Sequence, residues 1–322
     1  MSVYTLVQVQ DLEPFTSARH LGHPVSLEAI AQGIINSNYR LTTSHGTFIL
    51  TLVENRPEVE ALPFIMGLLE QLHRAGIPVP CPLKDADGAA VFTLHGRPAV
   101  IVTLLPGISP DVPVPSQCRQ LGSMLGSIHL QGRLPHDSPQ FTRSDRTGWQ
   151  GWEVMLRRLD SLPNPEHQKT IAWLDMELLW LKHHWLTLDL PSGLCHGDLF
   201  PDNTLFVDDR LSGIIDFYSA SHGPWLYDLA ISLCSWCLDD QGQPHPELIL
   251  ALLEGYDRIR PRTRTERDHL TTACRAAAFR FSLSRFHDHC FPRSGTTVTR
   301  RNPESFMARL RFLQSSPLPM EF

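Results

Sequence analysis

This sequence lacks a regular cysteine pattern, long apolar runs and an excess of positive charge. The seven cysteines are scattered through 322 residues, and an odd number without recurrent spacing does not predict a disulfide framework. The first residues include Asp11 and Glu13 and show no basic segment followed by an apolar one, so we expect no signal peptide. These absences together predict free thiols in a reducing compartment, the cytoplasm.

The chain also lacks the signatures of membrane and nucleic-acid binding. Its longest apolar stretch, near residues 225–238, contains Asp228 and is too short for a membrane span. A formal net charge of −6 predicts no general attraction to nucleic acid or to anionic lipid. The arginine-rich segment 258–267 is a local exception, and its Pro261 predicts a solvated loop leading into a helix. We therefore expect no nucleic-acid partner and no membrane association.

What remains is the composition of a globular protein, with 42% hydrophobic and 19% charged residues. A strand-rich part is predicted near residues 25–105. There, residues 39–43 and 47–53 flank one turn, while 90–94 and 98–102 flank another, which predicts two hairpins. A helix between the hairpins is predicted by apolar residues at helical spacing, namely Leu62, Ile65, Met66, Leu69 and Leu72.

The chain from about residue 108 onward is predicted to be mostly helical. One helix is indicated by the apolar spacing from Leu121 to His129, and another begins at Pro224. Cys234 and Cys237 fall on the apolar stripe of this second helix, so we expect buried thiols rather than a zinc site. The run 287–290, His-Asp-His-Cys, resembles a metal cluster only in composition.

The most informative residues lie in two short segments. Residues 195–203 read C-H-G-D-L-F-P-D-N and residues 213–217 read G-I-I-D-F, in register with the catalytic-loop pattern H-x-D-L-x-x-x-N and with a following Asp-Phe. Phosphoryl transfer needs a carboxylate to orient the attacking hydroxyl and oxygen ligands for magnesium. Asp198 suits the first role, and Asn203 and Asp216 suit the second. Turns and caps also favour Asp and Asn, but they do not explain the combined spacing.

These two segments resemble the aminoglycoside-phosphotransferase and choline-kinase superfamily, in which Gly replaces the Arg of the protein-kinase loop. Further segments are similar to the homoserine kinases of that superfamily: Asn36-Ser37-Asn38-Tyr39, residues 48–54, 62–64 and 77–80, Asp216-Phe217-Tyr218, and Tyr227-Asp228-Leu229-Ala230-Ile231. The resemblance implies an α+β, two-lobed protein-kinase-like fold. Residues 1–105 would form a nucleotide-binding lobe with an antiparallel β-sheet and one main helix, and residues 106–322 a mostly α-helical lobe with the catalytic loop.

The resemblance also implies where ATP would bind. Its phosphate loop would contain Gly33, Asn36, Ser37 and Asn38, and the linker near Thr103 and Leu105 would offer backbone groups to the adenine. Thr51 occupies the place where kinases of this shape usually carry a lysine. The cation that would replace this lysine is not identified by the sequence, and Arg40 and Arg56 are candidates.

The implied reaction is ATP- and Mg²⁺-dependent phosphorylation of L-homoserine in threonine biosynthesis. A homoserine carboxylate requires a cation, and Arg280 and Arg285 are candidates, although positions five apart on an ideal helix point about 140° apart. Tyr218 and Trp225 are candidates for shaping the pocket beside Asp198.

Several alternatives stay open at this stage. The acceptor could be choline, an aminoglycoside or a methylthio-sugar, or the chain could be a nucleotide-binding pseudokinase. Asp228 could cap its helix or brace the catalytic loop. The oligomeric state is not predicted.

Overall fold

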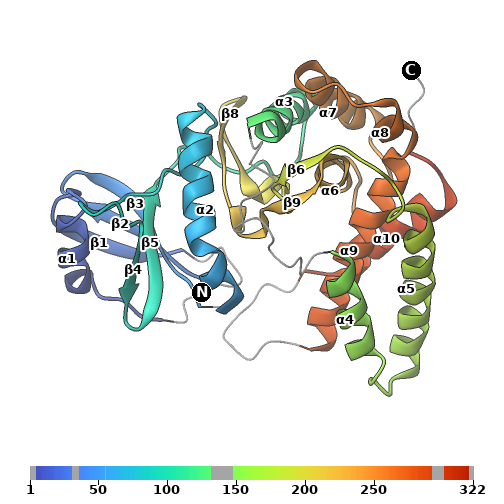
Figure 1. The fold of residues 1–322 in the computed structure, drawn as a ribbon, viewed down its shortest axis with the longest axis horizontal. Helices are drawn as coiled ribbons and strands as arrows, with labels where there is room; N and C mark the ends of the chain where they lie inside the picture. Colours follow the sequence, from blue (N-terminus) through green and yellow to red (C-terminus); the bar gives the residue numbers. More distant parts are fainter. Residues whose placement is uncertain (1–4, 31–35, 55, 132–147, 292–300, 319–322) are drawn as a thin grey trace. The chain divides into compact units, whose positions relative to one another are not determined.

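The structure is a computed structural model that describes residues 5–30, 36–54, 56–131, 148–291 and 301–318 (Figure 1). The chain divides into two compact units. Of the described residues, the first unit holds those within 1–107 and 212–218, and the second holds those within 108–211, 219–291 and 301–318. The first unit is rich in strands and the second is mainly helical.

A five-stranded antiparallel sheet forms the body of the first unit, in the order β1-β2-β3-β5-β4. Its strands are β1 (Pro24–Ala29), β2 (Ser37–Thr43), β3 (Gly46–Leu52), β4 (Val91–Leu94) and β5 (Arg97–Thr103). Both predicted hairpins are confirmed, because Thr43 pairs with Gly46 and Leu94 pairs with Arg97 across the turns. The sequence did not predict β1, whose residues are half-buried or exposed without clean alternation.

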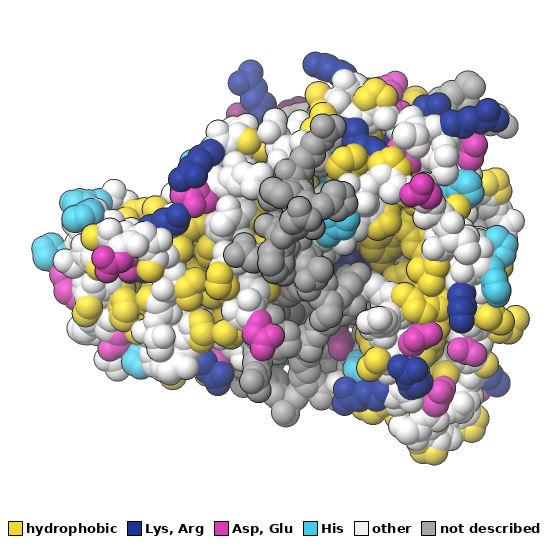
Figure 2. All heavy atoms as spheres, viewed as in Figure 1, with side chains coloured by type: hydrophobic (Ala, Val, Ile, Leu, Met, Phe, Trp, Pro, Cys, Tyr) yellow, Lys and Arg dark blue, Asp and Glu magenta, His cyan; other side chains and the backbone are white. Residues whose placement is uncertain are grey.

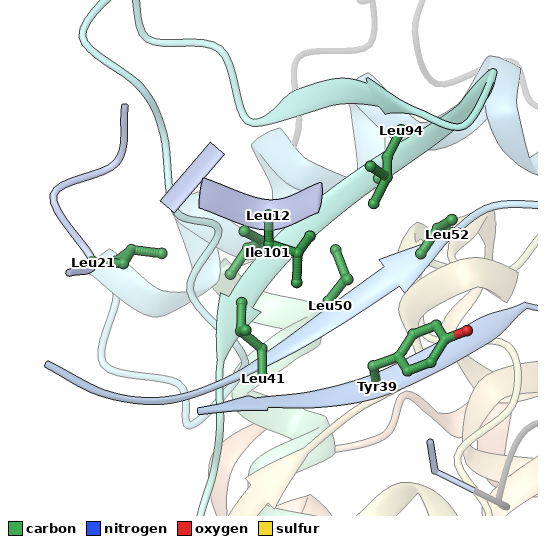
Figure 3. Packing of buried hydrophobic residues seen from close by; sticks show 9 residues of the cluster. Leu12, Leu21, Tyr39, Leu41, Leu50, Leu52, Leu94 and Ile101 are labelled. Carbon is green, nitrogen blue, oxygen red and sulfur yellow. The ribbon is translucent and has the colours of Figure 1, made fainter. Parts of the chain in front are cut away.

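The sheet buries apolar side chains on both faces. On β5, Ala99 and Ile101 belong to a core cluster with Leu12, Leu41 and Leu50, and Figure 3 shows Leu12 reaching this face from the 3₁₀ helix η1 (Val9–Leu12). The alternate β5 residues are also buried, as period-two alternation requires when both faces are covered. Helix α2 (Arg56–Arg74) lies beside the sheet, and its predicted apolar stripe is buried.

The second unit is built around α9 (Leu270–Cys290). This helix packs mainly against α4 (Trp149–Leu159), α5 (Pro165–His184), α6 (Trp225–Trp236) and α10 (Pro303–Ser315). The buried side of α9 includes Ala273, Ala276 and Ala277, and small side chains let neighbouring helices approach closely. The mainly helical character predicted for this part of the chain is confirmed.

A second close contact joins α3 (Pro115–Gln131) to α7 (Pro246–Ile259). A β-carbon added at Gly122 would lie 2.0 Å from the carbonyl oxygen of Leu252, and one added at Gly255 would lie 2.0 Å from that of Arg119. Neither space admits a side chain. Glycine at these positions is therefore a packing requirement, since the two backbones touch.

The prediction that residues 258–267 form a solvated loop is wrong for two of the arginines in this segment. Arg260 and Arg262 are buried, because each finds a carboxylate: Arg260 binds Glu266 of the short helix α8 (Arg264–Asp268), and Arg262 binds Asp257. A composition count could not show that these charges are paired internally. On the face drawn in Figure 2, charges of both signs are interspersed over the helical unit.

The state of the cysteines agrees with the prediction of free, buried thiols. All seven cysteines are free, and Cys234 and Cys237 are fully buried as predicted. Within the described ranges, no helix combines the length and hydropathy needed to traverse a bilayer.

Candidate active site

The loop that carries Asp198 begins where strand β6 (Ser192–Cys195) ends, and it continues through the 3₁₀ helix η3 (Pro201–Asn203) into β7 (Thr204–Val207). Gly197 adopts φ 77°, in the left-handed region that glycine enters without strain. A β-carbon there would also lie 2.7 Å from the backbone oxygen of Ser219. Both the conformation and the lack of space require glycine immediately before Asp198.

Asp198 is held by its own loop. The side-chain amide of Asn203 donates to the Asp198 backbone oxygen at 2.7 Å and to carboxylate Oδ2 at 3.3 Å. The Asp198 N–H donates to Nδ1 of His196 at 3.2 Å. Among the described residues, no hydrogen bond occupies the side-chain oxygen of Asn203, which leaves an uncharged oxygen beside a carboxylate. This is the donor set that a hard divalent cation prefers.

Asp228 braces the same loop from α6. Its carboxylate is fully buried and accepts the backbone N–H of His196 at 2.7 Å and that of Gly197 at 2.8 Å. Burial by itself would raise the pKa of Asp228, but the hydrogen bond from His129 and these backbone donors hold it below its ordinary value. Asp228 therefore stays charged. Of the two roles left open by the sequence, the structure shows bracing, since no side chain caps the start of α6.

A chain of buried hydrogen bonds extends from Asp228 into three further helices. His129 of α3 lies 3.1 Å from Asp228 through Nε2 and 2.7 Å from the Tyr256 hydroxyl through Nδ1. Arg260 donates to the same hydroxyl at 2.8 Å and binds Glu266 at 2.8 and 3.1 Å. Burial lowers the pKa of His129, so its neutral ring donates to Asp228 and accepts from Tyr256. This order satisfies each polar group.

Arg280 holds the loop from a second side. It is buried on α9 and donates to the backbone oxygen of Gly197 at 2.5 Å. Sequence reasoning missed this role, as it missed His129 and Tyr256. A histidine on the otherwise apolar stripe of α3 was the available signal, because a buried polar group must find a partner.

Asp216 follows strand β8 (Arg210–Ile214) and belongs to the first unit. Its side chain is exposed and its φ is 64°. A non-glycine residue in the left-handed region is uncommon, although aspartate enters it more readily than most residues. Tyr218 lies directly after it in the 3₁₀ helix η4 (Phe217–Ser219) and is half-buried.

Four of the candidate nucleotide-binding residues lie at one end of the strand pair β2 and β3, namely Asn36, Ser37, Asn38 and Thr51. Thr51 faces Asn38 across the strand pair and donates to its side-chain oxygen at 2.7 Å. Ser37 donates to Glu54 at 2.8 Å, and the Glu54 N–H donates to the Asn36 side chain at 3.2 Å. Gly33 lies outside the described residues, and the side chain of Arg56 is not described. Arg40 is exposed on β2.

Two more of the predicted residues lie at the end of β5 and just after it, Thr103 and Leu105. The Thr103 hydroxyl accepts the Cys81 N–H at 2.8 Å. No backbone hydrogen bond reaches the N–H or C=O of Leu105 from any residue that the structure describes. A half-buried peptide group without a backbone partner can bind a ligand edge.

Two candidate substrate residues have contrasting surroundings. Trp225 is buried, with Arg260 stacked 4.4 Å from its ring and Gly193 against its edge. Arg285 lines an open cavity of about 740 Å³ in the second unit.

One group of described residues has metal-ligand composition, namely His129, Cys195 and Asp228. Both ring nitrogens of His129 and both carboxylate oxygens of Asp228 already have protein partners. We therefore interpret this group as part of the hydrogen-bond network.

An antiparallel sheet unit, a helical unit and a loop in which Asn203 holds Asp198 define the class of kinase-like phosphotransferases. The chain matches the Phosphotransferase enzyme family over residues 26–262 and belongs to it. Its curated relatives include the homoserine kinase of Methylobacterium radiotolerans, 39% identical with 97% of this chain and 96% of the relative covered. The homoserine kinase of Paramagnetospirillum magneticum is 37% identical and covers 100% and 99%.

Solved structures show the same fold at low identity. An amicoumacin kinase in complex with AMP-PNP, Ca²⁺ and its antibiotic has a TM-score of 0.68 at 17% identity, with 92% of this chain and 90% of that chain covered. A spectinomycin phosphotransferase in complex with ADP and spectinomycin has a TM-score of 0.63 at 15% identity, covering 96% and 95%. The predicted fold class is confirmed by these likenesses.

Proposed function

We propose that this chain transfers the γ-phosphoryl group of ATP to the side-chain hydroxyl of L-homoserine, which yields O-phospho-L-homoserine and ADP. The observation that carries the proposal is the identity of up to 39% with homoserine kinases over nearly the whole of both chains. The loop geometry agrees with it, since Asp198 is positioned by Asn203 within a braced backbone. This reaction is a step in threonine biosynthesis.

In the proposed mechanism, Asp198 is the catalytic residue. Its carboxylate orients the homoserine hydroxyl and accepts its proton while the hydroxyl oxygen forms a bond to the γ-phosphorus. The bond between that phosphorus and the bridging oxygen of ADP breaks. The hydrogen bonds from Asn203 fix the carboxylate, so little reorganisation accompanies the transfer.

Asn203 and Asp216 are the proposed magnesium ligands. The side-chain oxygen of Asn203 and the carboxylate of Asp216 are hard oxygen donors, which fits Mg²⁺ rather than a soft metal. Bound magnesium would neutralise charge on the ATP phosphates.

We assign ATP to the first unit. Asn36, Ser37 and Asn38, with Gly33, are proposed to contact the phosphates, and Thr51 is tied to Asn38 where other kinases carry lysine. Thr103 and Leu105 are proposed to face the adenine, since the peptide groups of Leu105 have no backbone partner among the described residues.

For the acceptor site, the surroundings of the candidates differ. The guanidinium of Arg280 already binds the Gly197 carbonyl and Trp225 is packed in the core, which supports structural roles for both. Tyr218 stays a proposal for lining the acceptor site. A cytoplasmic location is supported by the seven free thiols.

A panel of acceptors tests the function. Coupled ADP release would be measured with homoserine, serine, choline and an aminoglycoside, with and without Mg²⁺. We expect the highest kcat/KM with homoserine, and serine should lose kcat because its hydroxyl is one methylene short of Asp198. Choline or the aminoglycoside outrunning homoserine would contradict the acceptor, and no turnover of any alcohol would indicate a pseudokinase.

A further inference from the structure

The cavity beside α9 and α10 contains an arginine whose charge is not compensated. The cavity measures about 740 Å³ and lies wholly in the second unit. Its lining comprises Asp240, Gln241, Arg285, Arg301, Asn302, Glu304, Ser305 and Ala308. The two helices lie side by side, so this lining is held by packed elements (Figure 1).

Arg285 and Arg301 line this cavity and Arg309 is an electrostatic neighbour of Arg285; two of these three arginines have acidic partners. Arg301 forms an ion pair with Asp202, and Arg309 forms one with Asp240 at 3.3 Å. Arg285 donates only to neutral oxygens, the Ser305 hydroxyl at 2.8 Å and the Asn302 carbonyl at 3.5 Å. Within the described ranges, no carboxylate lies within ion-pair distance of Arg285. Glu304, the other acidic residue of the lining, is paired with Arg311, so the charge of Arg285 is the surplus one in this set.

This surplus charge is energetically unfavourable in the protein as it stands. Burial, together with Arg301 and Arg309, lowers the pKa of Arg285 to about 10, while Asp198 and Asp240 act in the opposite direction. A half-buried cation without an anion is destabilising unless a ligand supplies the counter-charge. A group with a perturbed pKa that also lines a cavity is a candidate for a binding site.

The cavity also adjoins the catalytic loop. Phe200, two residues after Asp198, has the guanidinium of Arg301 at 5.3 Å and that of Arg285 at 5.9 Å from its ring centroid. Asp202 of the same loop holds Arg301. Asp198 also raises the pKa of Arg285 through electrostatic attraction, as a carboxylate on this nearby loop should. An anion at Arg285 would thus lie beside the loop that carries Asp198.

We propose that Arg285 binds the α-carboxylate of the acceptor amino acid, with Ser305 and Arg301 beside it, and so selects an amino acid over other alcohols. This inference rests on homoserine as the proposed acceptor. Only three carbon atoms separate the carboxyl carbon of homoserine from its hydroxyl oxygen, so an anchored carboxylate fixes where the hydroxyl can reach. The planar guanidinium matches a carboxylate in two parallel hydrogen bonds.

Two analogues separate this role from a structural one. 4-Hydroxybutyrate keeps the carboxylate and lacks the ammonium group, whereas 3-aminopropan-1-ol keeps the ammonium group and lacks the carboxylate. For Arg285→Met, we expect kcat/KM to fall about 100-fold with homoserine and with 4-hydroxybutyrate, mainly through KM. With 3-aminopropan-1-ol, kcat/KM should change by less than about threefold, because that molecule never used the site.

Two further variants complete the experiment. Arg264→Met removes an exposed arginine of α8 that is not part of the cavity lining, and it should leave kcat/KM unchanged with all three acceptors. Arg285→Lys keeps the charge but loses the planar guanidinium, so kcat/KM should fall less than in Arg285→Met and with the same dependence on the acceptor. This variant provides the measurement if Arg285→Met is unstable. Thermal unfolding of each variant would be recorded alongside.

The outcomes distinguish the inference from the function on which it rests. Equal losses with all three acceptors, in either Arg285 variant, would show that Arg285 only supports the fold and would overturn the inference. A wild-type protein that does not distinguish homoserine from 3-aminopropan-1-ol would overturn it as well. Failure of the proposed function has a different signature: wild-type protein that phosphorylates choline or an aminoglycoside in preference to homoserine.

Discussion

Single residues at the catalytic loop owe their roles to fixed orientation. The Asp198 carboxylate receives the Asn203 amide at 3.3 Å, and the backbone of the preceding Gly197 is held by Asp228 and by Arg280. A carboxylate fixed in this way can meet a hydroxyl without paying for its own ordering. Changes of one atom at these positions should therefore act on turnover far more than on folding.

Asp198→Asn replaces one carboxylate oxygen by an NH₂ group and so removes the proton acceptor. We expect kcat to fall by about 10²–10⁴ while ATP affinity is nearly unchanged, because the residue acts on the acceptor hydroxyl. Steady-state kinetics and nucleotide titration would measure the two effects. Asp208→Asn, in the turn before β8 with φ 51°, is a matched control since Asn tolerates that backbone. A kcat near the wild-type value in Asp198→Asn would remove Asp198 from the mechanism.

Asp216→Asn tests the metal assignment without altering the backbone, because Asn also adopts φ near 64°. Loss of the charge should abolish turnover and weaken binding of ATP in the presence of Mg²⁺, with little effect in its absence. Asn203→Ala removes an uncharged ligand, so its effect on Mg²⁺-ATP binding should be smaller. Titration calorimetry with and without Mg²⁺ decides the matter, and equal affinities in all three proteins would contradict both assignments.

At the scale of elements, close helix contacts support the loop. α3 carries His129 and α7 carries Tyr256, and these helices touch through Gly122 and Gly255. The contact brings the two polar side chains within hydrogen-bond distance of each other. Glycine in a helix is otherwise costly, by roughly 1 kcal/mol relative to alanine, which shows that packing outweighs propensity here.

Gly255→Ala should force α3 and α7 apart, because its β-carbon would lie 2.0 Å from the Arg119 carbonyl oxygen. We expect a loss of about 2–3 kcal/mol in the free energy of unfolding, typical of overpacking against backbone. Urea unfolding followed by circular dichroism measures it. Gly67→Ala is the matched control at an exposed position of α2, where the added β-carbon would have no atom within 4 Å, and it should be neutral or stabilising. Similar stability of the two variants would disprove the packing argument.

At the scale of the molecule, stability and the candidate active site share one buried polar network. His129, Asp228, Tyr256, Arg260 and Glu266 link α3, α6, α7 and α8 to the loop backbone. Such a network is stable only when each member keeps its protonation state. Its charges therefore connect folding to pH.

The free energy of unfolding should fall between pH 7.5 and 5.5 through His129. Burial lowers the pKa of this histidine, so below about pH 6.5 the unfolded chain binds a proton that the folded protein does not. Stability is then full above pH 6.5 and declines below it, by up to about 1.4 kcal/mol per pH unit. Urea unfolding of wild type and His129→Gln at both pH values isolates this contribution.

His129→Gln should be less stable at pH 7.5 but lose less stability on acidification than wild type. His183→Gln, at an exposed position of α5, should retain the wild-type dependence. If acidification lowers the free energy of unfolding equally in His129→Gln and in wild type, the buried ring does not cause the loss of stability at low pH.

The sequence by itself determined the local elements and the reaction chemistry. Period-two and helical spacing located the hairpins and α2, since those patterns arise from burying one face of a strand or helix. The spacing of Asp198, Asn203 and Asp216 indicated phosphoryl transfer. All three residues lie on one continuous loop and hairpin, so their order and spacing can be read directly from the chain. Both conclusions depend on residues that are near in the chain.

Only the tertiary structure decided which distant groups support that loop. Arg280 and Arg285 looked equivalent on α9, yet one binds the Gly197 carbonyl and the other lines a cavity without an acidic partner in the described residues. Arg260 and Arg262 looked solvated and are buried against carboxylates. The physical reason is that a charge takes its role from the partners that packing brings within a few ångströms, and chain order does not contain that information.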